Sequence, residues 1–297
     1  MQPDAVGSTR KPLEPNHQDF AELAALEADL RLAVGGQALL EEKLRSFFRS
    51  AIDEVIDTAR SGRFFFSDLE KTEKTYLGTK FEILLRDWLQ VPRGLRLDLM
   101  IGGREVDVKS TTIGHGWMIP PEAVDQFCIL LRVNEQDAKC AVGLVRARSD
   151  YLSVGNNRDA KKTITAANRT HIWWLVSDFD YTRNFWSIVT ADDRQEIMAL
   201  SGGTARLATL FERYQEIAIS RVQIAAVAQQ DDFMKRIRRN GGARDLLAPK
   251  GIAILYSETD RSLMQSLGLR FGFREFMSVC AKSPEHAQKL KSAGHID

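Results

Sequence analysis

Two aspartates and a lysine are spaced so that they could hold a metal ion and activate water. They lie in LRLDLMIGGREVDVKST, residues 95–111, where two short alternating runs flank Gly102-Gly103. Two glycines between such runs predict a two-residue hairpin turn of type I′. The register of that turn sets Asp98 opposite Asp107, with Cβ atoms about 5 Å apart. The two-residue period of a strand then puts Lys109 on the same face as Asp107.

Two carboxylates that close repel each other unless a cation lies between them. A divalent metal ion supplies that cation, and a lysine beside it can hold or deprotonate a water molecule. The pattern therefore indicates a metal-dependent hydrolase. The alternative is a solvated polar face on an edge hairpin, which would leave only Val106 and Val108 of that strand as core.

The Asp/Glu-x-Lys triplet is not specific by itself, so the hairpin around it carries the argument. The same triplet occurs on an expected helix surface, in a hairpin turn and in a polar loop, at Glu41–Lys43, Asp137–Lys139 and Asp159–Lys161. Only Asp107–Lys109 has a second carboxylate opposite it.

A third carboxylate, Glu82, lies in the apolar surroundings of GTKFEILLRDW. A glutamate on such a helix face is either neutralised by an arginine or used as a ligand for a metal or water. The nearby aspartates favour the second interpretation, a catalytic role. Glu105 falls one step nearer the hairpin turn, where we expect a peripheral role. His115, between two glycines, is expected to be non-catalytic.

The elements expected to position these groups indicate an α/β fold, a mixed sheet flanked by helices. Helical periodicity covers residues 20–59, with a break at Gly35-Gly36, and residues 73–89. Apolar runs predict strands at 126–133, 139–146 and 171–176. Residues 1–17 are expected to be disordered or loosely packed, and residues 18–200 to form the catalytic domain.

Ser201-Gly202-Gly203 is the best linker candidate, so residues 201–297 are expected to form a second domain. Helical patterns at 204–219 and 221–239, the strand-like GIAILY and a further helical stretch fit a winged-helix or helix-turn-helix module. The alternative is a helical accessory domain that only braces the first. The second predicted helix ends in a basic cluster that could bind phosphates, made of Lys235, Arg236, Arg238 and Arg239.

Composition limits the class of protein further. The chain has 297 residues, 44% of them hydrophobic and 27% charged, as in a soluble globular protein of two domains. It has neither a membrane-length apolar run nor an apolar signal sequence at its start, and its three cysteines form no CxxC pattern. We therefore expect a cytoplasmic protein.

Charge is distributed unevenly. Residues 201–297 hold 15 Lys and Arg against 10 Asp and Glu, whereas the first 200 residues carry an acidic excess. A basic second domain suits contact with nucleic acid. In the first domain, the polar loop around residues 155–162 offers side chains that can contact bases or phosphates, namely Asn157, Arg158, Lys161 and Lys162. With residues 117–122 it is expected to line the catalytic cleft.

The arrangement of Asp98 and Asp107-Val108-Lys109 around a glycine hairpin resembles the PD-(D/E)XK nuclease motif, with Leu97 where a proline often stands. KTEKTYLGTKFEI, WMIPPEA, NRDAKKT and the spacing from Glu82 to Lys109 resemble the NaeI-type restriction endonucleases. The likeness spans most of residues 65–175 and is looser over the tail.

The resemblance implies a type II restriction endonuclease of the type IIE kind, from a restriction-modification system. Such enzymes are homodimers that require Mg²⁺, cleave double-stranded DNA at a short palindrome and bind a second DNA copy as effector. Their C-terminal domain resembles the catabolite-activator DNA-binding fold. Glu82, Asp98, Asp107 and Lys109 match the catalytic positions.

In the mechanism that follows from this resemblance, Asp98, Asp107 and the Val108 carbonyl hold Mg²⁺ in octahedral oxygen geometry. Glu82 orients a water molecule or a second ion, and Lys109 orients or activates the nucleophile. Two alternatives stay open. One is a nicking endonuclease of DNA repair with the same fold, and the other is a DNA-binding regulator whose nuclease-like domain is inert.

Overall fold

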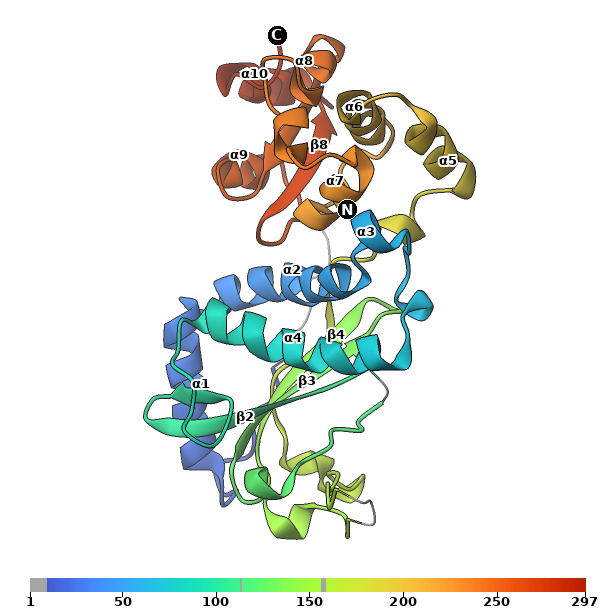
Figure 1. The fold of residues 1–297 in the computed structure, drawn as a ribbon. Helices are drawn as coiled ribbons and strands as arrows, with labels where there is room; N and C mark the ends of the chain where they lie inside the picture. The colour runs from blue at the N-terminus through green and yellow to red at the C-terminus, as the bar shows by residue number, and fades with distance from the viewer. Residues whose placement is uncertain (1–9, 113, 156–158) are drawn as a thin grey trace. The chain divides into compact units, whose positions relative to one another are not determined.

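The computed structural model describes residues 10–112, 114–155 and 159–297, which form two compact units (Figure 1). Unit 1 comprises Met1–Glu41 and Lys71–Tyr181, and unit 2 comprises Glu42–Glu70 and Thr182–Asp297. The domain boundary expected at residue 200 thus falls inside unit 2. Residues 42–70, which the sequence pattern placed with the catalytic domain, also belong to unit 2.

Unit 1 contains a five-stranded sheet and the helices that accompany it. Its elements are α1 (Phe20–Val34), the first turn of α2 (Gln37–Ile56), α4 (Lys71–Leu89), β1 (Leu99–Ile101), β2 (Arg104–Thr111), β3 (Phe127–Asn134), β4 (Lys139–Arg146) and β5 (Trp173–Asp180).

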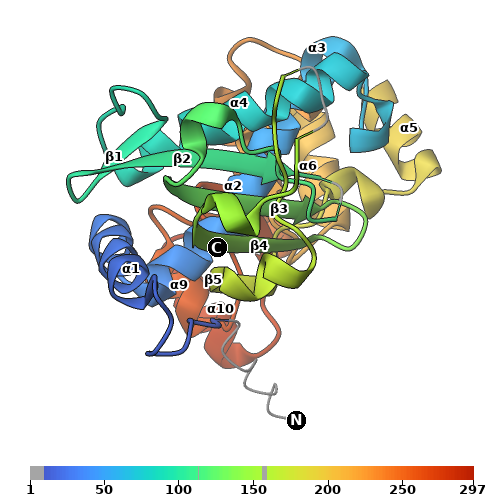
Figure 2. The same ribbon diagram turned by 90° about the horizontal axis from the view of Figure 1, so that it is seen from below.

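The sheet is mixed, as the sequence predicts, with strand order β1-β2-β3-β4-β5. Strands β2 and β3 are parallel, and the other neighbouring pairs are antiparallel. Figure 2 shows β2, β3 and β4 side by side in this order. The four residues Cys128–Leu131 of the central strand β3 are all buried, which explains why its sequence is apolar without alternation.

The chain before α1 is packed against unit 1 from residue 10 onward. Lys11 forms a backbone bridge with Trp174, and Leu13 is buried. The carboxylate of Asp19, 1% exposed, accepts a hydrogen bond from Arg148 Nε at 2.8 Å. Within residues 10–17, Lys11 and Leu13 thus contact unit 1, and such long-range contacts are not visible in a polar sequence. Residues 1–9 lie outside the described residues.

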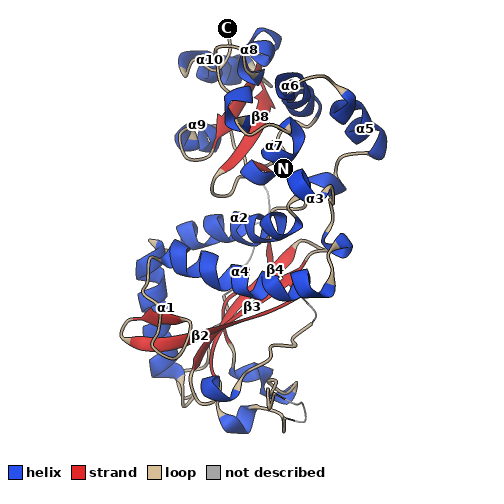
Figure 3. Ribbon diagram, in the orientation of Figure 1, coloured by secondary structure: helices blue, strands red, loops and turns tan. Residues whose placement is uncertain are grey.

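Unit 2 contains a three-stranded sheet among short helices, drawn red and blue in Figure 3. Its elements are the rest of α2, α3 (Thr58–Ser61), α5 (Ala191–Ala199), α6 (Gly203–Arg213), β6 (Ile219–Ser220), α7 (Arg221–Ala228), α8 (Ala243–Leu247), β7 (Ile252–Tyr256), α9 (Arg261–Ser266), β8 (Glu275–Cys280) and α10 (Pro284–Ser292). The strand order is β6-β8-β7, with both pairs antiparallel.

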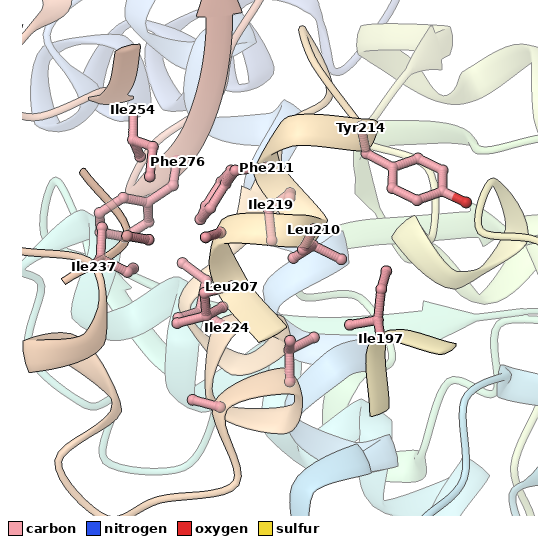
Figure 4. Close-up of a cluster of buried hydrophobic side chains, with 14 of the residues drawn as sticks. Ile197, Leu207, Leu210, Phe211, Tyr214, Ile219, Ile224, Ile237, Ile254 and Phe276 are labelled. Carbon is pink, nitrogen blue, oxygen red and sulfur yellow. The ribbon is translucent and has the colours of Figure 1, made fainter. Parts of the chain in front are cut away.

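The helices of unit 2 enclose an apolar core (Figure 4). Leu207, Leu210 and Phe211 of α6 are fully buried, and they belong to one cluster with Ile224 of α7 and Phe276 of β8. The spacing of the three α6 residues is the helical i, i+3, i+4 pattern, so this stripe is the face of α6 that packs inward.

The second part of α2 joins unit 2 through buried polar contacts. Asp53 accepts a hydrogen bond from Ser220 Oγ at 3.0 Å and pairs with Arg49 Nε at 2.7 Å. Ser46 Oγ accepts the Phe273 N–H at 2.8 Å. Because a buried charge without a partner is strongly destabilising, these pairs fix this part of α2 to the residues that follow position 182.

The helix predicted over 221–239 is wrong beyond Ala228. Helix α7 ends at Ala228, its C-cap residue Gln229 adopts a left-handed conformation, and up to residue 239 only one short 3-10 turn follows, Phe233–Arg236. Asp231 and Asp232 lie between the two, and aspartate favours caps and turns over helix interiors. Within the part of the chain that the structure covers, every helix is too short or too polar to cross a membrane.

Candidate active site

The hairpin has the register that the sequence predicts. Leu99 pairs with Val106 and Ile101 with Arg104, so Asp98, the next residue outward, lies opposite Asp107. Gly102 and Gly103 have φ angles of 55° and 76°, the left-handed conformation that a type I′ turn requires at both positions.

The alternation along β2 separates an apolar face from a charged one. Val106 and Val108 are at most 1% exposed and turn to one side of the sheet. Asp107, 4% exposed, and the partly buried Lys109 turn to the other side. A solvated polar face is therefore excluded for Asp107, because its side chain is inside the protein.

The Lys109 ammonium lies among three oxygen atoms. Its Nζ is 2.8 Å from Asp107 Oδ2, 2.9 Å from the Val108 carbonyl oxygen and 3.8 Å from Asp98 Oδ2. Asp98 Oδ2 also accepts the Val108 N–H at 2.7 Å, which holds this carboxylate against β2. The two aspartates and the carbonyl thus converge on one cationic centre.

The electrostatics of this cluster are unusual for carboxylates. Burial raises the pKa of Asp107 to about 6, and the charge of Asp98 adds to this, although Lys109 opposes it. Burial lowers the pKa of the Lys109 ammonium, but Asp107 and Asp98 outweigh it, so the net shift is upward. One lysine does not neutralise the site, which therefore attracts further positive charge.

Glu82 reaches the cluster from α4. Burial and then the charge of Asp98 raise the pKa of Glu82 to about 7, with Asp107 also contributing. The helix can approach β2 closely because Gly78, one turn before Glu82, has no side chain. A Cβ atom there would lie 3.2 Å from Ser110 Oγ. Gly78 was not among the residues expected at the site, although a lone glycine inside a helix is a signal for close packing.

The donor set suits a hard divalent cation. Two carboxylates and a backbone carbonyl are oxygen ligands, which Mg²⁺ prefers. Asp107 Oδ2 is buried and lies 2.8 Å from Lys109 Nζ. The geometry of this pair is not that of a hydrogen bond, so the oxygen keeps its capacity to bind a cation. No ready-made cage exists in the described part of the chain, because no three His, Cys, Asp or Glu side chains there are grouped closely enough to hold a metal.

Glu105 has the peripheral position expected for it. Its Oε1 accepts the backbone N–H groups of Leu95 and Arg96, so the carboxylate holds the loop before Asp98. The His115 ring packs against the Trp117 ring, with centroids 5.4 Å apart.

The residues predicted to contact DNA in unit 1 are only partly described. Lys162 forms a backbone bridge with Ile119, so the two segments expected to line the cleft are neighbours. Lys161 lies 3.5 Å from the Asp159 carboxylate. Asn157 and Arg158 lie outside the described residues.

The predicted basic cluster of unit 2 is divided between paired and exposed side chains. Lys235 and Arg236 lie 3.5 Å and 3.0 Å from the carboxylate of Asp232. Arg238 and Arg239 are exposed, without an ion-pair partner among the residues that the structure describes. These cations do not end a long helix, since the helix stops at Ala228.

The chain is similar to known proteins over most of its length. A family model described as restriction endonuclease NaeI matches residues 41–289. The type II restriction enzyme NaeI of Lentzea aerocolonigenes is 36% identical over 236 residues, which cover 77% of this chain and 74% of the relative. The matched region includes the hairpin, α4 and most of unit 2.

Proposed function

Because the chain belongs to the NaeI family of type II restriction endonucleases, we propose that the Asp98–Asp107 cluster cleaves both strands of duplex DNA at a short palindrome, with Mg²⁺ as cofactor. Family membership makes the chain a site-specific deoxyribonuclease. The observation that supports this location of the chemistry is the convergence of Asp98, Asp107 and the Val108 carbonyl on Lys109 Nζ.

The three converging oxygens are the groups that would hold the metal ion. Bound there, Mg²⁺ would neutralise the scissile phosphate, promote ionisation of the attacking water and stabilise the leaving oxygen. Asp107, on a paired strand, and Asp98, held by the Val108 N–H, are fixed before any substrate arrives. Such preorganised charge is the main source of catalysis in phosphoryl transfer.

Lys109 and Glu82 have complementary roles in this proposal. Lys109, an ammonium beside Asp107 and Asp98, is proposed to donate hydrogen bonds to a phosphate oxygen or to the attacking water. Glu82, whose pKa is raised to about 7, can accept a proton near neutral pH and orients the attacking water.

Unit 2 is proposed to bind a second DNA duplex as effector through a winged-helix-like module. Support comes from the chain order α6, β6, α7, α8, β7, β8, in which α9 is inserted between the last two strands, and from the antiparallel strand order β6-β8-β7. In a winged helix, a first strand likewise precedes two helices, and the last two strands form the wing. Exposed Arg238 and Arg239 are the cations proposed to contact its phosphates.

Homodimers are proposed because a palindromic site has two-fold symmetry that a dimer matches. A symmetric dimer cuts both strands, whereas a nicking enzyme of DNA repair cuts one. Digestion of mixed plasmid DNA with Mg²⁺, followed by end sequencing, tests this and reports the recognition site.

The variant Asp107→Asn tests the active site. It keeps the side-chain volume but removes the charge, so cleavage should fall by a factor of about 10³ or more while DNA binding is retained. The matched control is Asp137→Asn, which changes the same Asp-x-Lys triplet in an exposed turn and should cut at the normal rate. Cleavage by Asp107→Asn at the wild-type rate would refute the assignment.

A further inference from the structure

The loop between α4 and β1, residues 91–97, presents an exposed leucine between two arginines. Leu95 is 94% exposed, the largest value for a large apolar side chain among the described residues. Arg93 and Arg96 are exposed as well, and neither has an ion-pair partner in the part of the chain that the structure covers. We call residues 91–97 the Leu95 loop.

The Leu95 loop is held in a defined conformation. Glu105 Oε1 accepts the N–H groups of Leu95 and Arg96, the latter at 2.9 Å, and the Met100 N–H donates to the Pro92 carbonyl at 2.9 Å. Gly94 is required, because a Cβ there would lie 2.7 Å from the Leu97 carbonyl oxygen. The leucine is therefore held out in water by a loop with fixed anchor points, although apolar surface is driven to leave water.

The loop lies directly beside the proposed catalytic cluster. Leu97 is buried in the core of unit 1, and Asp98 follows it. Leu95 and Asp98 are three positions apart in the chain, so their Cα atoms are at most about 10 Å apart. A DNA duplex whose scissile phosphate lies at the cluster is therefore within reach of the Leu95 loop.

We propose that the Leu95 loop enters the minor groove of the DNA next to the cut, with Leu95 wedged against a base step and Arg93 and Arg96 on the flanking phosphates. This rests on the proposed nuclease function. Charge complementarity favours DNA as the occupant, since two unpaired cations flank the apolar tip. Apolar wedges beside arginines are how proteins kink DNA from the minor groove. That groove is about 6 Å wide and suits a narrow loop, whereas the major groove admits a helix or ribbon.

The wedge is tested with Leu95→Ala in the full-length protein. Leu32→Ala is the matched control, because Leu32 is an 83% exposed leucine on α1, outside the Leu95 loop. The substrate is a duplex with the site found by end sequencing and 2-aminopurine, whose fluorescence rises when it unstacks, at the step beside the cut. Binding is measured in the Asp107→Asn background and cleavage in single turnover.

We expect fluorescence to rise on binding with Leu95 present, to stay low with Leu95→Ala, and to be unaffected by Leu32→Ala. Cleavage should slow about tenfold or more for Leu95→Ala, the effect of ~1.4 kcal/mol in the barrier. Leu95→Met should cut at close to the wild-type rate. A mismatch that already unstacks the base step should bring the cleavage rate of Leu95→Ala back towards that of wild type. Arg93→Gln and Arg96→Gln should each reduce the slope of log affinity against log salt by about 0.9.

If Leu95→Ala cut at the wild-type rate and gave the same fluorescence rise on binding as wild type, the wedge would be overturned while the nuclease function stayed intact. Wild-type protein that cuts no DNA would instead remove the proposed function. If Leu95→Ala converted a dimer into monomers in sedimentation, with the fluorescence rise retained, the loop would be a contact between copies of the chain and the DNA wedge would be refuted.

Discussion

Glu275 should make unit 2 lose stability as the pH rises from acid to neutral. Its side chain is 2% exposed and accepts hydrogen bonds from the Gly272 N–H and from Thr182 Oγ1 at 2.8 Å. Burial raises the pKa of Glu275 to about 7 from its ordinary 4.5, because these two bonds and Arg45 do not repay the loss of hydration, and Asp53 adds repulsion.

The sign follows from proton linkage. The folded state binds the proton more tightly than the unfolded state, so the contribution is fully present below pH 4.5 and is lost as the pH rises through 7. The full difference between the two pKa values corresponds to roughly 3 kcal/mol, and most of it falls between pH 5 and pH 8.

The perturbation is Glu275→Gln, which has nearly the same shape and cannot ionise. Its amide can still accept the Gly272 N–H and bond the Thr182 hydroxyl. Urea unfolding at pH 5 and pH 8 measures the free energy of unfolding of both proteins. The advantage of Glu275→Gln over wild type in the free energy of unfolding should grow by roughly 2–3 kcal/mol between these pH values.

The matched control is Glu285→Gln on α10, whose carboxylate is exposed and pairs with Lys289 at 2.8 Å. The free energy of unfolding of Glu285→Gln should differ from that of wild type by nearly the same amount at pH 5 and pH 8, since exposed ion pairs contribute little to stability. If the stability of Glu275→Gln relative to wild type stayed the same or fell between pH 5 and pH 8, ionisation of Glu275 would not be penalised in the folded protein, and the reasoning from burial would be refuted.

Five further results are expected. Lys109→Gln should abolish cleavage but not DNA binding, and wild-type cleavage should stop with EDTA and return with Mg²⁺; retained cleavage in either assay would remove the proposed chemistry. Gly78→Val should slow cleavage about tenfold or more by moving α4, and Ser110→Ala should partly restore it; a normal rate would show that the 3.2 Å approach does not position Glu82. Phe211→Ala should lower the free energy of urea unfolding by about 3–5 kcal/mol through a cavity, and less than 1 kcal/mol would contradict its burial. Asp19→Ala should lower it by about 2 kcal/mol by leaving Arg148 and Tyr151 without their acceptor, and should leave cleavage unchanged.

Local patterns were sufficient for the hairpin and for most elements. The Gly102-Gly103 turn fixes its own register within a few residues, so the position of Asp98 opposite Asp107 could be predicted. The apolar runs of β3 and β4 and the periodicities of α1, α2 and α4 are strong signals over eight residues or more. The prediction that α7 extends to residue 239 was wrong, because it continued the helical pattern past the aspartates at 231 and 232.

Long-range contacts decided what local patterns could not. The apolar face of α2, which includes Leu44, Phe48 and Ala51, shows the same helical spacing along its whole length, so the pattern marks no division between the two units. Its assignment to unit 2 from residue 42 onward depends on partners such as Ser220 and Phe273, far away in the sequence. The sequence also gave no sign that residues 10–17 would pack.

The sequence by itself determined the type and facing of the site's residues, because the turn and the two-residue period of a strand are set by neighbouring residues. Only the tertiary structure decided that Asp107 is buried, that Glu82 approaches over Gly78, and that Glu105 holds the Leu95 loop. Each of these depends on the approach of segments that are separate in the chain. Burial raises the pKa values of Asp107 and Glu82, so the chemistry of the site emerges only when the chain is folded.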